Sequence, residues 1–156
     1  MASKRPEPAV TLDDIDKALV EQLQADGRLP YTKLAAGVGL SEAAARQRVQ
    51  RLIESGVVQI VAVTDPMMLG FHRMAMVGVR GEGDLRAAAD AIAALPEVDY
   101  VVMVGGQFDL LVEVVCEDDD HLLSLLDQMR CIPGVRTTET FTYLRLFKQT
   151  YAWGTR

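Results

Sequence analysis

The chain has 156 residues, of which 49% are hydrophobic and 6% aromatic. This length allows one domain with a hydrophobic core or two small domains, and this composition excludes a disordered chain. The formal net charge of −6 argues against a protein that binds nucleic acid by charge alone. Residues 1–64 hold eight Lys/Arg and eight Asp/Glu, whereas residues 65–156 hold eight against fourteen, so the first half remains compatible with nucleic-acid binding.

Residues 1–10 carry Pro6 and Pro8 and are predicted to be a flexible arm. They lack the apolar core of a secretion signal, and no apolar run approaches the roughly 18 residues of a membrane-spanning helix. We therefore expect a cytoplasmic protein without a membrane partner. Cys116 and Cys131 are expected to be buried free thiols.

The first predicted helix begins near Thr11, with Thr11 or Asp13 as its cap, and ends before Gly27. A second, short helix with Thr32 as its cap extends to about Val38. The apolar residues of the first helix recur at helical spacing: Leu12, Ile15, Leu19 and Leu23.

A third helix, over residues 41–55, follows the bend at Gly39-Leu40, and Ser41 is its predicted cap. Ala45, Val49 and Leu52 form one apolar stripe. Residues 11–56 are thus predicted to be a helix-turn-helix, winged-helix-like DNA-binding domain. The alternative is a helical hairpin whose arginines are merely solvated.

The polar faces of the third helix carry long side chains that suit phosphates and base edges. We expect its N-terminal end to enter the major groove first. Arg48 has two open roles, binding a phosphate or bracing the hairpin against Asp16. The predicted DNA-binding residues are Thr32, Ser41, Glu42, Ala43, Ala44, Arg46, Gln47, Arg48 and Arg51.

Residues 57–71 are predicted to be a strand linker. The β-rich run 57–63 reads as one arm of a small wing or as a linking strand. Asp65-Pro66 ends it, and residues 65–71 mark the boundary between two domains.

The second half alternates strands and helices. Asp84 caps a helix that Pro96 ends, and Asp118 caps a helix that extends to about Arg130. Strands are predicted over residues 72–80, 98–104, 108–116 and 135–147. This order predicts a ferredoxin-like βαββαβ domain over residues 72–150, with both helices on one face, and hence an α+β protein. Residues 151–156 form a tail whose Tyr151 and Trp153 are expected to pack on a partner subunit.

Apolar residues fall on both faces of the predicted sheet. Met103, Leu111, Leu144 and Leu146 are assigned to the face that two helices cannot cover. An uncovered apolar face predicts a partner, and the simplest partner is a second copy of the chain in a homodimer.

The predicted hairpin turn offers groups for a small ligand. Backbone N–H groups of Gly105 and Gly106 can bind a carboxylate, and Asp109 can pair with an ammonium group. The alternative is an ordinary turn in which Asp109 caps its own backbone. The candidate ligand residues are Tyr100, Met103, Gly105, Gly106, Gln107, Phe108, Asp109, Thr138 and Thr140.

Catalytic and metal chemistry have no clear pattern in the sequence. The acidic run 117–121 is more typical of a solvated helix N-terminus than of a metal site. No nucleophile, base and orienting acid recur at catalytic spacing, and the two histidines are far apart. We expect no enzyme activity, no catalytic or metal residues and no cofactor.

The chain resembles the Lrp/AsnC family of feast/famine transcriptional regulators from about Leu12 to Lys148. The order and spacing of several short segments carry the resemblance. These are residues 12–16, 23–28, 34–35, 38–41, 48–52, 54–56, 69–71 and 133–135, together with Gly106, Asp109 and Thr140.

The resemblance implies a DNA module, a strand linker and a C-terminal effector and oligomerisation domain. Family members form dimers that assemble further, often to octamers, and respond to amino acids. The family's hairpin pattern is commonly Thr-Gly-x-x/Tyr-Asp, and here Gly105 replaces the threonine and Phe108 the frequent tyrosine.

We therefore expect a sequence-specific regulator that binds double-stranded operator DNA. An amino-acid effector at the C-terminal domain interface would modulate its DNA binding or assembly. An alternative from another class is a ferredoxin-like small-molecule sensor or enzyme whose helical hairpin only mediates protein contacts. A third is a purely structural oligomer.

Overall fold

The computed structural model describes residues 11–156, which divide into two compact units. One unit, here the helical unit, comprises residues 11–63 and 148–156. The other, the sheet unit, comprises residues 64–147. The arm predicted over residues 1–10 lies outside the described residues.

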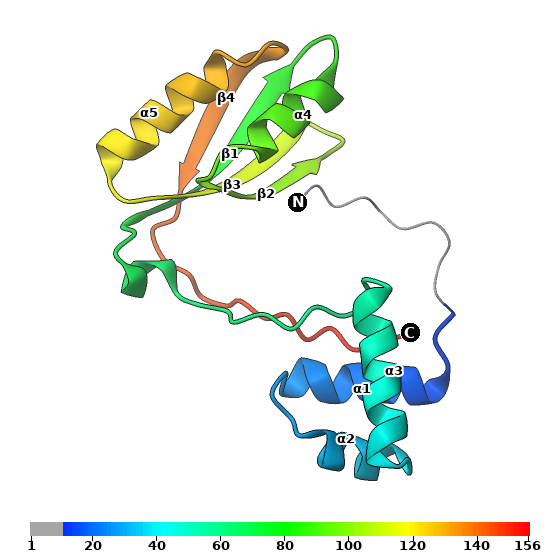
Figure 1. Cartoon of the computed structure of the whole chain (residues 1–156). Coiled ribbons are helices and arrows are strands. Elements are labelled where there is room, and N and C mark those ends of the chain that lie inside the picture. Colours follow the sequence, from blue (N-terminus) through cyan, green and yellow to red (C-terminus); the bar gives the residue numbers. More distant parts are fainter. Residues whose placement is uncertain (1–10) are drawn as a thin grey trace. The chain divides into compact units, whose positions relative to one another are not determined.

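Three helices build the helical unit: α1 (Asp14–Ala25), α2 (Tyr31–Val38) and α3 (Glu42–Glu54) (Figure 1). Asp13 caps α1, where its side chain accepts a hydrogen bond of 2.7 Å from the backbone N–H of Asp16. The predicted apolar stripes meet in one core, whose fully buried members are Leu19, Leu34, Ala45, Val49 and Leu52. The predicted helix-turn-helix is present.

The turn between α2 and α3 has the predicted chemistry. Gly39 adopts a left-handed conformation with φ of 70°, which costs glycine little. Ser41 caps α3 by accepting from the backbone N–H of Ala44. The cap predicted at Thr32 is wrong: α2 begins at Tyr31 after Pro30, so Thr32 already lies inside the helix.

The strand predicted over residues 57–63 is absent from the described structure, and with it the wing. A strand needs a neighbouring backbone for its hydrogen bonds, and β-rich composition cannot supply one. A short 3-10 helix, Pro66–Leu69, follows, with Asp65 as its cap.

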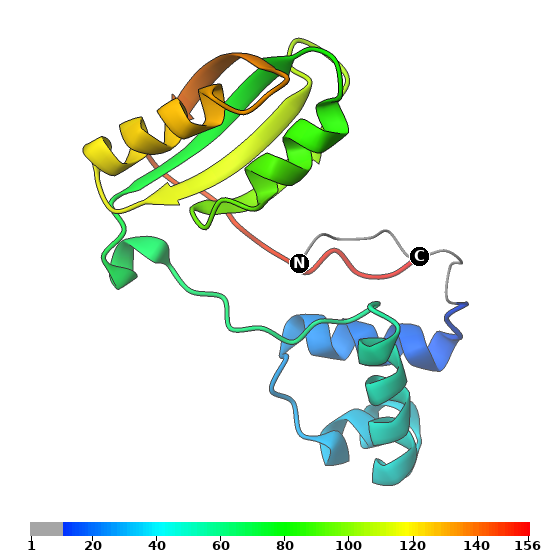
Figure 2. The same ribbon diagram turned by 45° about the horizontal axis from the view of Figure 1, so that its top comes forward.

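The sheet unit follows the predicted order: β1 (Arg73–Gly81), α4 (Leu85–Ala93), β2 (Val98–Met103), β3 (Leu110–Cys116), α5 (Asp119–Arg130) and β4 (Val135–Thr142). The antiparallel sheet has the strand order β2-β3-β1-β4, which is the ferredoxin-like arrangement. Both helices cover the same face (Figures 1 and 2).

The last strand is shorter than predicted. Its pairing with β1 ends at Ala75 opposite Thr142, close to where β1 itself begins. The backbone N–H of Tyr143 still donates to the carbonyl of Met74 in β1, but the strand ends at Thr142, so the predicted extension to residue 147 is wrong. Leu144 and Leu146 are exposed beyond the sheet and do not belong to its open face.

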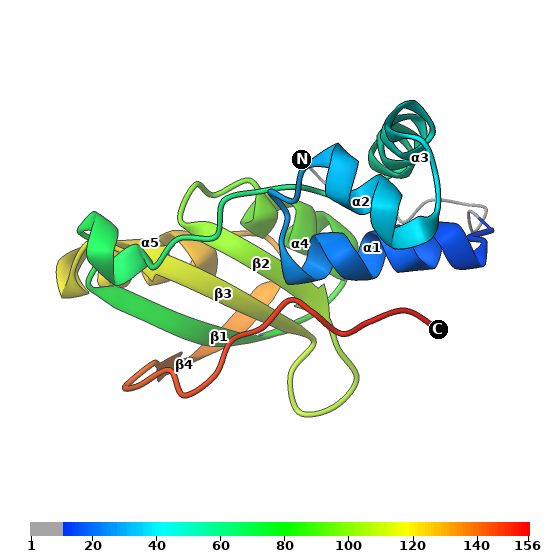
Figure 3. The ribbon, with the colours of Figure 1, turned by 90° about the horizontal axis from the view of Figure 1, so that it is seen from below.

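The two faces of the sheet differ sharply. Ala75, Val77 and Val79 point to the helices and are buried in the main core. No helix among the described residues of this unit covers the other face (Figure 3). The register places these open-face residues: Met74, Met76, Tyr100, Val102, Leu111, Glu113 and Phe141.

Met103 was predicted on the open face, and this is wrong. The register places it opposite Leu110, which faces the helices, so Met103 shares the covered face at an edge strand. Leu111, in contrast, lies on the open face as predicted. Within residues 11–156, no helix is both long and apolar enough to span a bilayer.

Candidate functional site

The inner side of α3 is held by acids of α1. Asp16 is the only buried polar or charged residue among residues 11–156, with 1% exposure. Its Oδ1 accepts from Arg48 Nη1 at 2.9 Å, and its Oδ2 accepts from Arg51 Nη2 at 2.6 Å. Asp13 accepts a second hydrogen bond from Arg48 at 2.6 Å. These four charges bind the third helix to the first.

The pKa values follow from this network. The backbone N–H of Asp16 and the guanidinium of Arg48 hold the pKa of Asp13 below its ordinary value. Hydrogen bonds to Asp13 and Asp16 raise the pKa of Arg48. Of the two open roles, the structure gives Arg48 the brace. Arg51, predicted to bind DNA, joins the same brace, although its side chain stays 56% exposed.

Arg46 has different neighbours. Its guanidinium lies 4.3 Å from the centre of the Tyr31 ring, and its Nη2 donates to Glu42 Oε1 at 2.9 Å. Neither partner belongs to α1. Tyr31 was not predicted as a site residue; the available signal was an aromatic residue directly after Pro30, at the first position of α2.

The outer face of α3 is polar and hollowed. A hollow of about 630 Å³ is lined by Tyr31, Glu42, Ala43, Arg46, Gln47 and Gln50. A neighbouring hollow of about 510 Å³ is lined by Gln47, Gln50 and the outer parts of Arg48, Arg51 and Glu54. Ser41 and Thr32 are exposed, and Ala44 is half-buried. The structure therefore brings Glu42, Ala43, Arg46 and Gln47 together on one surface.

The hairpin turn between β2 and β3 holds Asp109 in place. Oδ2 of Asp109 accepts from the backbone N–H of Gly81 at 2.9 Å, and its own N–H donates to Val79. The carboxylate thus caps β1 and not its own backbone. Within residues 11–156, its Oδ1 makes no hydrogen bond. Gly106 has φ of 145°, a conformation that favours glycine.

Phe108 folds over the open face of the sheet. Its ring covers Gly78 so closely that a Cβ added at Gly78 would lie 2.7 Å from a ring carbon. The ring also contacts Phe141 edge-on, with 5.9 Å between centroids, and lies 5.5 Å from the guanidinium carbon of Arg80. Phe108 therefore belongs to the open face.

The remaining candidate ligand residues divide between the two faces. Tyr100 lies on the open face opposite Glu113. Thr138 and Thr140 lie on the helix-covered face, where Thr138 Oγ1 accepts from Arg130 of α5. A single chain does not gather the predicted ligand residues around one cavity. Gly105 and Gln107 are exposed in the turn.

The acidic run 117–121 caps α5. The Asp118 side chain accepts from the backbone N–H of His121 at 2.8 Å, and Asp119 pairs with Arg73. No group of three metal-ligating side chains occurs in the part of the chain that the structure describes.

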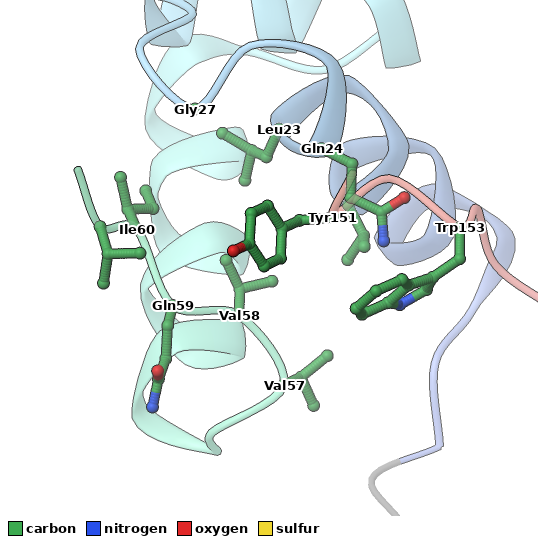
Figure 4. A pocket seen from close by; sticks show the side chains of 11 residues that line it. Leu23, Gln24, Gly27, Val57, Val58, Gln59, Ile60, Tyr151 and Trp153 are labelled. Atoms are coloured by element: carbon green, nitrogen blue, oxygen red, sulfur yellow. The ribbon is translucent and has the colours of Figure 1, made fainter. Parts of the chain in front are cut away.

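The C-terminal tail lies on the helical unit (Figure 4). Tyr151 and Trp153 line a groove of about 330 Å³ with α1 and residues 57–61. Gln24 donates to and accepts from the backbone of Gly154, and Thr155 donates to Glu21. In this chain the two aromatic residues line a groove of its own helical unit, and both stay more than half exposed. Their packing on a partner subunit stays a prediction.

Both units match domains of known proteins. Residues 12–53 match the AsnC-type helix-turn-helix domain, and residues 74–153 match the Lrp/AsnC ligand binding domain. The HTH-type transcriptional regulator FL11 of Pyrococcus horikoshii is 34% identical over 143 residues, covering 90% of this chain and 95% of the relative. The chain belongs to the Lrp/AsnC family.

Solved structures of Lrp/AsnC proteins share the fold. The leucine response regulatory protein of Mycobacterium tuberculosis superposes with a TM-score of 0.81 at 33% identity, covering 88% of this chain and 96% of that one. An L-Met complex of a transcriptional regulator from Neisseria meningitidis superposes with a TM-score of 0.80 at 26% identity, covering 91% and 96%. The Lrp/AsnC relatives are named as transcriptional regulators, which confirms the prediction of a regulator over an enzyme.

Proposed function

We propose that this Lrp/AsnC transcriptional regulator binds double-stranded operator DNA through α3, and that an amino acid modulates its DNA binding or assembly. The outer face of α3 carries this proposal. It presents Glu42, Arg46 and Gln47 together, while the inner face is fixed to α1 through Asp16. A helix held rigidly on one side and polar on the other suits insertion into a major groove.

The DNA-binding residues then have distinct roles. Ser41, Ala43 and Ala44 begin the helix and approach the groove, where small side chains permit close contact. Arg46 and Gln47 reach bases, and the exposed parts of Arg48 and Arg51 reach phosphates without leaving Asp16. Thr32, exposed on the first turn of α2, lies at a helix N-terminus that favours a phosphate.

The effector is an amino acid bound at the hairpin turn. The free oxygen of Asp109 can pair with an α-ammonium group, and the backbone N–H groups of Gly105 and Gly106 can bind the carboxylate. The relative that was solved with L-Met supports this ligand class. Because one chain does not gather the other candidates, we propose that a second copy completes the site.

Assembly uses the open face of the sheet. Exposed Phe141 and Tyr100 lie on it with Met74, Met76 and Leu111, an apolar area typical of an interface. We propose a homodimer that assembles further, to an octamer in the family manner, and that acts in the cytoplasm. Two recognition helices in successive major grooves would require half-sites about 34 Å apart.

Random-site selection on duplex DNA, followed by gel shift with each amino acid added, tests the proposal. We expect the wild type to enrich a palindromic site and one amino acid to change its affinity or its assembly. Arg46→Ala should weaken binding to the selected site, with unchanged elution in size-exclusion chromatography. Enrichment of no site at low salt would contradict DNA binding.

Asp109→Ala tests the effector site separately, by calorimetry with the amino acid that acts in the gel shift. Loss of ligand binding with unchanged affinity for the selected DNA is expected. Equal ligand binding by wild type and variant would remove Asp109 from the site.

A further inference from the structure

The three arginines of α3 are not equivalent. Arg48 and Arg51 each give a hydrogen bond to the buried carboxylate of Asp16. Arg46 gives none to α1 and lies on the outer face, with 59% of its side chain exposed. It is therefore the arginine of this helix whose whole guanidinium faces the surface proposed to meet DNA. The inference below rests on that proposed function.

Two neighbours orient the Arg46 side chain. The Tyr31 ring lies 4.3 Å from the guanidinium carbon, a distance at which a cation and an aromatic face attract each other. Glu42 takes one N–H of Nη2 at 2.9 Å from the preceding helical turn. The ring can oppose tilting of the guanidinium and leaves the other N–H groups at its edge available.

Tyr31 is itself fixed in position. It begins α2 directly after Pro30, and its half-buried side chain packs against the core of the helical unit. Its ring is thus a rigid support that comes from a different helix than Arg46. Side chains carried on such supports lose less conformational freedom when they bind.

The donors and acceptors of this group match one kind of base pair. An oriented guanidinium edge can donate two parallel hydrogen bonds to O6 and N7 of a guanine in the major groove. Glu42, whose carboxylate is adjacent, can accept from the N4 amino group of cytosine, which lies beside the guanine O6. Phosphates repel Glu42, so the same carboxylate disfavours binding that is not base-specific.

We propose that Tyr31 is a positioning residue that holds Arg46 for the recognition of a guanine, with Glu42 facing the paired cytosine, in each half-site of the operator. Tyr31 itself touches no base in this arrangement. Arg46 and Glu42, which line the hollow on the outer face of α3, contact the edge of that G·C pair.

Random-site selection with wild type, Arg46→Ala, Tyr31→Phe and Tyr31→Leu tests this assignment. The wild type should enrich a G·C pair at one position of each half-site. Fluorescence titration of sites substituted there should show a preference of about 5- to 150-fold over the other pairs. Arg46→Ala should lose this preference and leave the other positions unchanged.

Tyr31→Leu should weaken the preference for this pair about 2- to 5-fold, because leucine keeps the apolar packing but lacks the aromatic face. Tyr31→Phe is the matched control and should behave as the wild type. Circular dichroism of each variant verifies folding. A structural role alone would lower binding to all sites equally and would not distinguish leucine from phenylalanine.

The outcomes separate the two proposals. If the wild type enriches no DNA site, the proposed function fails. If it enriches a site but Arg46→Ala keeps the full base preference at every position, or Tyr31→Leu equals the wild type, DNA binding stands and the present inference is overturned.

Discussion

The helical unit and the sheet unit differ in where they place polar and apolar side chains. In the helical unit the exposed outer face of α3 carries polar side chains, and the buried interior contains a charge, Asp16, that binds two arginines. In the sheet unit the main core is apolar, and apolar side chains also lie on the open face, including Met74, Met76 and Phe141. The polar face of α3 therefore suits a charged polymer, whereas the apolar open face of the sheet suits another protein surface.

The two units also differ in what holds their elements together. Backbone ladders join the four strands of the sheet unit. The helical unit has no ladder among its described residues, so α3 is held by the turn at Gly39 and by side-chain contacts. Its architecture should therefore be more sensitive to a lost charge, and that of the sheet unit more sensitive to a change of volume.

The largest expected effect is that of Asp16→Asn. This change removes a buried charge that two arginines need, and should destabilise the helical unit by about 2–4 kcal/mol while the sheet unit is unaffected. Urea unfolding followed by two-dimensional NMR separates the units. Asp14→Asn, two residues before Asp16 and exposed, is the control. Equal loss in both variants would show that the network does not hold α3.

A matched pair of glycine substitutions probes sensitivity to volume. Gly78→Ala places a methyl group against the Phe108 ring and should destabilise the sheet unit by about 1–3 kcal/mol. Gly37→Ala, inside α2, meets only the flexible end of Gln22 and should stabilise the helical unit by about 0.5–1 kcal/mol. Labelling of buried Cys116, whose thiol pKa burial raises to about 11, reports opening of the sheet unit. Stabilisation by Gly78→Ala would contradict the close packing of Phe108.

Acid should weaken the helical unit through Asp13. The Asp16 backbone N–H, followed by Arg48, lowers its pKa below the ordinary 3.8, so the carboxylate stabilises the fold above that pH. This contribution is lost as the pH falls through the lower folded value. In Asp13→Asn, the free energy of unfolding of the helical unit, followed by NMR, should fall less steeply as the pH is lowered. In Asp119→Asn the same change should appear only in the sheet unit, because Arg73 lowers the pKa of Asp119.

The smallest effect concerns the tail. Gln24→Ala removes two hydrogen bonds to Gly154 at an exposed site, which should cost less than about 1 kcal/mol. The backbone N–H of Gly154 donates to Gln24, so its hydrogen exchange reports how the tail is held. We expect faster exchange at Gly154 with unchanged labelling of Cys116. Unchanged exchange would mean that the hydrogen bonds do not hold the tail.

Local chemistry made much of the fold predictable from the sequence. The caps at Ser41, Asp84 and Asp118 were identified, and Asp13 was one of the two caps predicted for the first helix, because a short polar side chain at a helix start satisfies free N–H groups. Cys131 was expected to be buried and is exposed, since it follows the last turn of α5 directly.

Features that depend on distant partners were harder to predict. The strand over residues 57–63 was wrong because no strand pairs with it, and Met103 was misplaced because a bulge between Val98 and Tyr100 shifts the register of β2. Within the candidate site, spacing predicted Arg46 and Arg51 as DNA-binding residues but could not show that Asp16 engages Arg51 or that the Tyr31 ring lies beside Arg46. Such pairings arise only from tertiary packing.

The seating of the C-terminal tail on α1 means that the helical unit is not encoded by one continuous stretch. The polypeptide leaves that unit after residue 63 and re-enters it at residue 148, so two covalent tethers join the units. Excising residues 11–63 as a fragment would uncover the apolar groove, and a fusion partner appended after Arg156 would emerge beside α1. A chimaera that carries the helical unit should therefore contain both residues 11–63 and residues 148–156.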